Sequence, residues 1–178
     1  MPESGLTVLL GGARSGKSAL AVEMGRRHAG GVTFLATSPP IDGDLADRIA
    51  RHRAERPAWP TIEEPHDVAG ALTGAGDDLV IVDCLTLWVN NLLHRGDADA
   101  DIEALSRSTA AGAAERAGPT VVITNEVGLG VHPETELGRR YRDVLGRVNQ
   151  HWVQAADVAL LLVAGRAVPL SDPWTCLR

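Results

Sequence analysis

The sequence "GGARSGKS" occupies residues Gly11–Ser18. It fits the pattern G-x-x-x-x-G-K-[ST], which marks a phosphate-binding loop between a strand and a helix. An apolar run, "LTVLL" (6–10), precedes it, and a stretch with helical periodicity follows it. A match in a chain of this length arises by chance with odds of about one in a hundred, so an incidental glycine turn is a poor explanation. We therefore predict a phosphate-binding loop at this position.

The residue types in this loop suit a polyphosphate. Glycine lets the backbone curl so that successive N–H groups point at phosphate oxygens, and the following helix N-terminus adds positive potential. Lys17 would bring a mobile charge to the β- and γ-phosphates. The Ser18 hydroxyl would be placed to ligate Mg²⁺.

Outward from the loop, strand and helix patterns alternate along the whole chain, so we expect one α/β domain over residues 1–178. Continuous apolar runs predict strands of a mainly parallel sheet covered by helices on both faces: 6–10, 32–37, 79–83, 120–124 and 158–165. Helical patterns cover 15–30, 41–55, 100–118 and 133–156. The last has one apolar stripe: Leu137, Tyr141, Val144, Leu145, Val148 and Trp152. The segments 54–66 and 125–133 are expected to be long functional loops.

Composition excludes several classes of protein. The chain has 178 residues, 44% of them hydrophobic, which is ample for one core. A formal net charge of -6 argues against a general nucleic-acid partner. The two cysteines form no CxxC and no metal spacing, as expected of reduced thiols in a cytoplasmic protein. We also expect no signal peptide and no membrane span.

Polar residues follow several predicted strands, where ligands of parallel sheets gather. Asp83 closes the run "LVIVD" and is placed as a Walker-B aspartate, which would hold Mg²⁺ together with Ser18. Thr37 and Ser38 fit a ligand contact and ordinary turn chemistry equally well. At the end of the fourth strand come Asn125 and Glu126. We expect Glu126 to serve Mg²⁺ or a substrate hydroxyl.

A basic run, "RIARHRAERP" (48–57), stands out in this acidic chain. On a helix, Arg48, His52 and Arg56 are spaced by four residues and share one face. Alone, this pattern favours a solvated helix face. Beside a phosphate-binding loop, a neutral imidazole flanked by arginines also suits nucleophilic attack at phosphorus.

Five segments in this order resemble one known family: "GGARSGKS", "FLATS", "RIARHRAERPAWPTIEEP", "VIVDCLTLWVNNLL" and "VITNEVGLGVHP". The chain resembles, from about Leu6 to about Leu170, the bifunctional adenosylcobinamide kinase/adenosylcobinamide-phosphate guanylyltransferases of cobalamin biosynthesis. The resemblance implies a RecA-like P-loop NTPase fold and a homotrimer. It also implies two reactions, which use ATP or GTP with Mg²⁺: phosphorylation of adenosylcobinamide, and GMP transfer from GTP to that phosphate.

The resemblance also implies roles for particular residues. His52 would accept GMP as a covalent intermediate, and Lys17 would act beside it in catalysis. His132 stands where the family pattern has an aliphatic residue before the proline. The implied nucleotide contacts are Gly11, Gly12, Ala13, Arg14, Ser15, Gly16, Lys17, Ser18, Ala36, Thr37, Ser38, Arg53, Ala54, Glu55, Arg56, Glu64 (in preference to Glu63) and Asp83.

Two other classes compete with this interpretation. One is a simple P-loop kinase of a small molecule, without a covalent intermediate. The other is a nucleotide-switched binding protein without transfer chemistry. The apolar segment "LTLWVNNLL" (85–93) is compatible with a subunit interface, although core packing explains it better.

Overall fold

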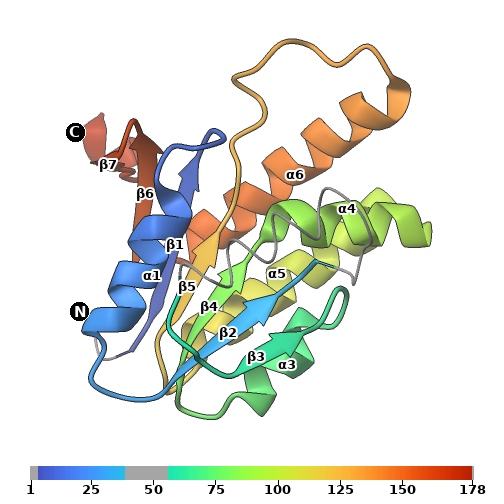
Figure 1. Ribbon diagram of the computed structural model, residues 1–178. Helices are drawn as coiled ribbons and strands as arrows, with labels where there is room; N and C mark the ends of the chain where they lie inside the picture. The colour runs from blue at the N-terminus through green and yellow to red at the C-terminus, as the bar shows by residue number, and fades with distance from the viewer. Residues whose placement is uncertain (1–3, 39–55, 178) are drawn as a thin grey trace.

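The computed structural model describes residues 4–38 and 56–177. Its centre is a seven-stranded sheet in the order β3-β2-β4-β5-β1-β6-β7 (Figure 1). All neighbouring strands are parallel except β6 and β7, which form an antiparallel hairpin at one edge. The strands are β1 (Leu6–Gly11), β2 (Val32–Ala36), β3 (Thr61–Glu63), β4 (Leu79–Asp83), β5 (Thr120–Ile123), β6 (Val158–Val163) and β7 (Arg166–Pro169).

The apolar runs predicted as strands are strands because both of their faces are buried. Successive residues of β4 show this: Val80 and Val82 belong to one core cluster, while Leu79 and Ile81 belong to the other. A strand with two buried faces cannot alternate apolar with polar residues, which explains the continuous runs.

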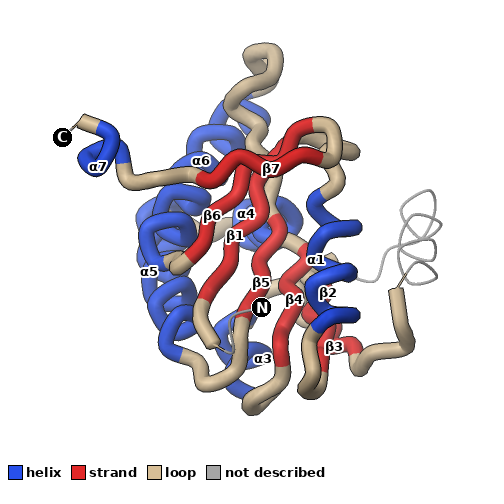
Figure 2. Tube along the Cα trace, turned by 90° about the vertical axis from the view of Figure 1, so that its left-hand side faces the viewer, coloured by secondary structure: helices blue, strands red, loops and turns tan. Residues whose placement is uncertain are grey.

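Helices cover both faces of this sheet, as predicted, but unequally. Figure 2 shows α1 on one side of the strands and α5 and α6 on the other. The larger core cluster lies between the strands and helices α3, α4, α5 and α6, and the smaller one lies under α1. The helices are α1 (Lys17–Arg27), α3 (Val68–Gly74), α4 (Leu85–Arg95), α5 (Asp99–Glu115), α6 (Glu136–Ala155) and α7 (Pro173–Cys176).

Several elements differ from the sequence prediction. The segment expected to be a long loop over 54–66 contains β3, a short edge strand parallel to β2. Helices α3, α4 and α7 and strand β7 were not predicted. Leu137, placed on the apolar stripe of α6, is 50% exposed because it lies in the first turn of the helix. The helix predicted over 41–55 lies outside the described residues.

The apolar segment 85–93 forms most of helix α4, and most of its apolar side chains belong to the core. Leu85, Trp88, Val89 and Leu92 are fully buried in the larger cluster. The Trp88 ring meets that of Trp152 from α6 edge to face, with centroids 6.4 Å apart. Such edge-to-face pairs add to the stabilisation from burial alone. Within the described part of the chain, this segment therefore packs inward.

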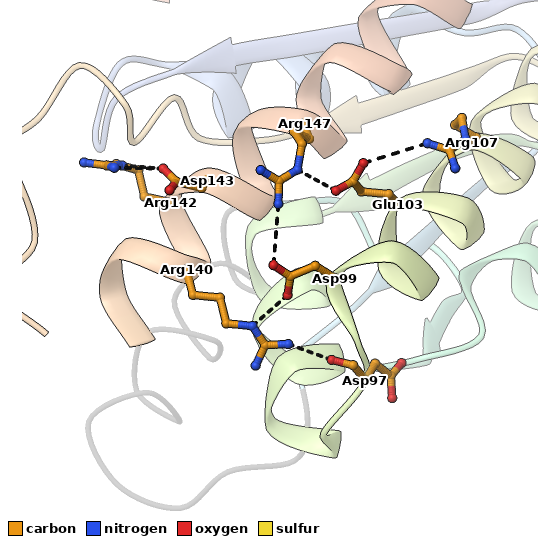
Figure 3. A network of polar contacts seen from close by, with 8 residues as sticks. All are labelled: Asp97, Asp99, Glu103, Arg107, Arg140, Arg142, Asp143 and Arg147. Atoms are coloured by element: carbon orange, nitrogen blue, oxygen red, sulfur yellow. Dashed lines mark hydrogen bonds and ion pairs between the residues drawn. The ribbon is translucent and has the colours of Figure 1, made fainter. Parts of the chain in front are cut away.

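Helices α5 and α6 are also joined by charges along their exposed edge (Figure 3). Arg147 of α6 pairs with both Glu103 and Asp99 of α5, and Arg140 pairs with Asp99 at 2.7 Å. Isolated surface pairs contribute little, but shared partners make this a network that fixes how the two helices lie against each other. Within the described ranges, no helix is both long and apolar enough to cross a membrane.

Candidate nucleotide-binding site

The loop between β1 and α1 takes the shape that its glycines require. A Cβ on Gly11 would lie 2.4 Å from the carbonyl oxygen of Leu162, so no other residue fits beside β6. Gly16 has φ of 103° and forms the N-cap of α1. A side chain is strained in that left-handed conformation, whereas glycine is not. The loop therefore leads directly into the N-terminus of α1.

Lys17 begins α1 and turns back over the loop. Its Nζ donates hydrogen bonds to the carbonyl oxygens of Gly11 at 2.9 Å and Gly12 at 2.7 Å. A longer contact of 3.4 Å joins Nζ to Ser15 Oγ. Burial lowers the pKa of Lys17, and nearby Asp83 partly offsets this. The ammonium group is thus held by the loop that would surround a phosphate chain.

The end of β4 lies beside this loop. In the sheet, Asp83 is in register with Ala36 of β2 and Ile123 of β5, so three strands end at one level. The Asp83–Cys84 peptide bond is cis. Asp83, Cys84 and the P-loop residues Ala13 to Ser18 line one cavity of about 460 Å³. The Walker-B position predicted from sequence is therefore adjacent to the predicted phosphate loop.

Arg56 closes part of this cavity from the far side. Its guanidinium carbon lies 3.6 Å from the centre of the Phe34 ring, and its Nη2 donates to Thr61 Oγ1 at 2.8 Å. A guanidinium over an aromatic face is held by cation–π attraction. Arg56 is one of the implied nucleotide contacts. The others in that segment, Arg53, Ala54 and Glu55, lie outside the described residues, as does His52.

Of the two neighbouring glutamates, Glu63 lines the cavity and Glu64 does not. Glu64 had the better sequence match, but its Oε1 accepts hydrogen bonds from the backbone N–H groups of His66 and Asp67 at 2.8 and 2.9 Å. Successive residues of an extended strand point to opposite sides, so only one of the two can face the cavity. The structure assigns that place to Glu63.

Thr37 has a structural position rather than a place in the cavity wall. It is fully buried, its Oγ1 donates to the Cys84 carbonyl at 2.7 Å, and the same oxygen accepts from the Cys84 N–H at 2.8 Å. The amide of Asn91 on α4 donates to the Thr37 carbonyl at 2.7 Å. Thr37 therefore ties the ends of β2 and β4 together, while its neighbours Ala36 and Ser38 line the cavity.

Several cavity residues lie outside the phosphate-loop and Walker-B motifs. Asn125 follows β5 and lines the cavity, whereas Glu126, which we expected to be functional, does not. The Glu126 carboxylate accepts from the Gly128 N–H at 2.8 Å. The remaining lining residues could have been found in the sequence only from the alternation of side chains along the strands and from the first turn of α4. They are Ala19, Phe34, Cys84, Thr86, Leu87 and Ile123.

The donor set at the cavity fits Mg²⁺ bound through a nucleotide. The Ser18 hydroxyl and the Asp83 carboxylate both line it, and oxygen ligands are those that Mg²⁺ prefers. Among the described residues, no group of three or more His, Cys, Asp and Glu side chains is arranged to hold a metal. Two protein oxygens suit an ion that takes its other ligands from phosphates and water.

The chain is similar in sequence to proteins of one known family. A family profile described as cobinamide kinase / cobinamide phosphate guanyltransferase matches residues 7–170. This chain belongs to that family. A bifunctional adenosylcobalamin biosynthesis protein, CobP of Pseudomonas aeruginosa, is 41% identical over 92% of this chain and 95% of its own length. The CobU protein of Salmonella typhimurium is 38% identical over 93% of this chain and 99% of its own. The chain is thus a kinase and guanylyltransferase by family.

Solved structures show the fold independently. An ATPase from a bacterial type III secretion system superimposes with a TM-score of 0.55 at 13% identity, over 89% of this chain and 51% of that one. The ATP synthase subunit NeqB of Nanoarchaeum equitans gives 0.50 at 14% identity, over 98% and 47%. The chain spans about half the length of these neighbours. At such identities the likeness shows the fold alone, a RecA-like P-loop NTPase with a mainly parallel sheet.

Proposed function

We propose that this enzyme phosphorylates the aminopropanol hydroxyl of adenosylcobinamide and then transfers GMP from GTP to that phosphate, releasing pyrophosphate. The observation that carries the proposal is the cavity at the carboxyl edge of the sheet, where the phosphate loop, Asp83, Glu63 and Arg56 meet. The family description and the relatives' names support both reactions. On the same resemblance we propose a homotrimer in the cytoplasm.

For the kinase step, the residues on the β1–α1 side would bind the triphosphate. Backbone N–H groups of the loop and the N-terminus of α1 would receive phosphate oxygens. Lys17, now bonded to the loop carbonyls, would move its charge onto the β- and γ-phosphates of ATP or GTP. Mg²⁺ between Ser18 and Asp83 would supply positive charge where negative charge develops.

For the guanylyl step, the nucleophile we propose is His52, whose role rests on the sequence and the family resemblance. Its imidazole would attack the α-phosphate of GTP, the α–β bridging bond would break, and pyrophosphate would leave from the phosphate loop. The adenosylcobinamide phosphate would then displace the histidine and take the GMP. A covalent intermediate divides one difficult displacement into two easier ones.

The test is to incubate the protein with α-labelled GTP, denature it, and measure an acid-labile, base-stable adduct. His52→Ala should reduce labelling by roughly 100-fold or more while γ-phosphate transfer to adenosylcobinamide persists. Lys17→Ala should reduce both reactions by roughly 100-fold, since both need the phosphate loop. His94→Ala, a change to an exposed histidine at the end of α4, is the matched control and should label like the wild type.

Each alternative has its own signature in this experiment. Labelling that survives His52→Ala would exclude the proposed nucleophile. Transfer of the γ-phosphate without any adduct would identify a simple P-loop kinase. Slow hydrolysis without either transfer would identify a nucleotide-switched binding protein.

A further inference from the structure

Asn125 lines the cavity, and neither the phosphate-loop motif nor the Walker-B motif includes it. It follows β5, and β5 lies between β4, which ends in Asp83, and β1, which leads into the phosphate loop. Ile123 of β5 is in register with Asp83 on one side and Leu9 on the other. Asn125 lines the cavity together with Lys17, Ser18 and Asp83. Asn125 therefore shares one cavity wall with the groups that would surround a terminal phosphate.

The backbone of Asn125 is held from both sides. Its N–H donates to Thr86 Oγ1 of α4 at 3.0 Å, and its carbonyl accepts from the Asn149 amide of α6 at 3.0 Å. Two helices thus fix one residue at the end of a strand.

Asn149 is a polar residue on the buried face of α6. It is 4% exposed, and the other buried residues of α6, among them Leu145 and Val148, are all apolar. Its Oδ1 accepts from the hydroxyl of fully buried Thr124 at 2.7 Å, and its Nδ2 donates to the carbonyl of Asn125. A buried amide is costly unless both of its polar groups are paired, and here both pair with the chain just after β5.

The side-chain amide of Asn125, by contrast, makes no hydrogen bond to any residue in the described part of the chain. It offers N–H donors and one carbonyl acceptor. A fixed backbone and an uncommitted amide at a cavity are what a contact to a ligand requires, since little freedom is lost when the ligand binds.

We propose that Asn125 is a catalytic residue of the phosphoryl-transfer step; the proposal rests on the function proposed above. The amide N–H donates to an oxygen of the γ-phosphoryl group, and Oδ1 accepts from the attacking hydroxyl. The hydroxyl oxygen forms the new bond to phosphorus, and the bond from phosphorus to the β–γ bridging oxygen breaks. The nucleoside diphosphate leaves with that electron pair, and the hydroxyl proton passes to the transferred phosphoryl group, because an amide cannot take it.

This assignment separates the two reactions. In guanylyl transfer the attack is at the α-phosphate, so no hydroxyl has to be aligned against the γ-phosphoryl group. Asn125 should therefore matter for phosphoryl transfer and much less for formation of the GMP adduct, although both use the same phosphate loop.

The experiment measures kinase kcat and KM with ATP and adenosylcobinamide, and GMP labelling with α-labelled GTP, in the full chain. Asn125→Ala should lower kinase kcat by roughly 100-fold, as the loss of one preorganised donor does elsewhere, with KM for ATP and GMP labelling within about threefold of wild type. Asn125→Asp, which has the same shape and puts a carboxylate next to phosphate, should lose at least as much. Asn90→Ala on α4, the same chemical change outside the cavity wall, should change neither reaction.

Asn149→Leu tests the positioning network. It should lower kinase kcat by roughly 10-fold and leave GMP labelling intact, because the Asn125 carbonyl loses its partner. An unchanged kinase kcat in both Asn125 variants would overturn the proposal, and so would an equal fall of both reactions. Retained labelling shows that a variant has folded. A wild-type enzyme that transfers no phosphate to adenosylcobinamide would overturn the proposed function as well, so the two failures are distinguishable.

Discussion

At the scale of single residues, Cys84 shows how position overrides the usual chemistry of a side chain. A cysteine at the N-terminus of a helix, as Cys84 is at α4, ordinarily becomes more acidic. Here burial raises the pKa of the Cys84 thiol to about 12, and the negative charge of Asp83 contributes to the same shift. The thiol that lines the cavity is therefore neutral at physiological pH.

We predict that only one of the two thiols reacts readily in the folded protein. At neutral pH, a thiol reagent such as dithionitrobenzoate should modify exposed Cys176 quickly and Cys84 only after denaturation, since the thiolate is the reactive form. The measurement is the number of thiols titrated per chain before and after adding denaturant. Cys176→Ser should remove the fast reaction. Rapid labelling of that variant would contradict the raised pKa of the Cys84 thiol.

How far the site could be predicted depended on whether a residue belongs to a local pattern. The phosphate loop and Asp83 lie within contiguous motifs, and the structure brings both to one cavity. Glu64 was preferred to Glu63 on the family resemblance, because a proline follows it. Strand β3 has only three residues, which is too few for alternation to show in the sequence which of the two faces the cavity. Phe34 has a second role, under Arg56, that depends on the pairing of β2 with β3, and no local pattern encodes that pairing.

At the scale of elements, the prediction was accurate for the continuous apolar strands and for α1, α5 and α6, and it missed α3, α4, α7 and β7. The five runs predicted as strands are all strands, and α1, α5 and α6 lie within their predicted ranges apart from one residue at the start of α5. Helix α4 was missed although Thr86, Asn90 and His94 form a polar stripe at helical spacing. Six of its eleven residues are buried, so the segment is dominated by apolar residues. Hairpin strand β7 has only four residues and directly follows the run 158–165, so no separate pattern marks it in the sequence.

The packing of α5 against α6 places His151 where protonation of its imidazole is unfavourable. His151 Nε2 lies 3.3 Å from a guanidinium nitrogen of Arg107, which can only donate, so the imidazole nitrogen accepts and the ring is neutral. Burial lowers the pKa of His151, with Arg107 adding to the effect, Glu103 opposing it and Arg147 adding again. Protonation would place a new positive charge among these arginines.

We predict that this interface loses stability as the pH falls below the ordinary histidine range. The unfolded chain binds a proton at His151 near pH 6.5, whereas the folded chain binds it only at lower pH. Between those values the unfolded state holds more protons, so the free energy of unfolding decreases as pH falls. Urea unfolding at about pH 7.5 and about pH 5.5, on either side of the ordinary histidine pKa, measures this decrease. It should be smaller for His151→Gln, and an equal decrease in both proteins would rule out the contribution of His151.

At the scale of the whole molecule, Arg116 joins elements at the end of the sheet opposite the cavity. Its guanidinium donates to the carbonyl oxygens of Leu72 in α3, and of Gly76 and Asp78 before β4. It also donates to Thr120 Oγ1 at 2.9 Å, where β5 begins. One side chain thus connects α3, α5, β4 and β5.

We predict that Arg116→Ala lowers the free energy of unfolding by on the order of 2–3 kcal/mol, because several carbonyl groups lose a charged partner at once. Kinase kcat should be unchanged, since the residue lies outside the cavity wall. Chemical denaturation measures this free energy. Arg116→Lys keeps the charge but not the planar fork of donors, so its free energy of unfolding should lie between those of the wild type and Arg116→Ala. Wild-type stability in Arg116→Ala would show that water replaces these bonds without cost.

The order of strands has a consequence for how the protein is made. Strand β1 is synthesised before the other described strands, yet its two neighbours in the sheet are β5 and β6, the fifth and sixth of these strands in chain order. The final hairpin even supports the first loop, because the Gly165 N–H donates to the Ser15 carbonyl at 2.9 Å. Contacts this distant in sequence form late and slowly. β5 and β6 therefore have to be synthesised before the phosphate loop can bind a nucleotide, and a polypeptide that ends before Gly165 lacks the hydrogen bond to the Ser15 carbonyl.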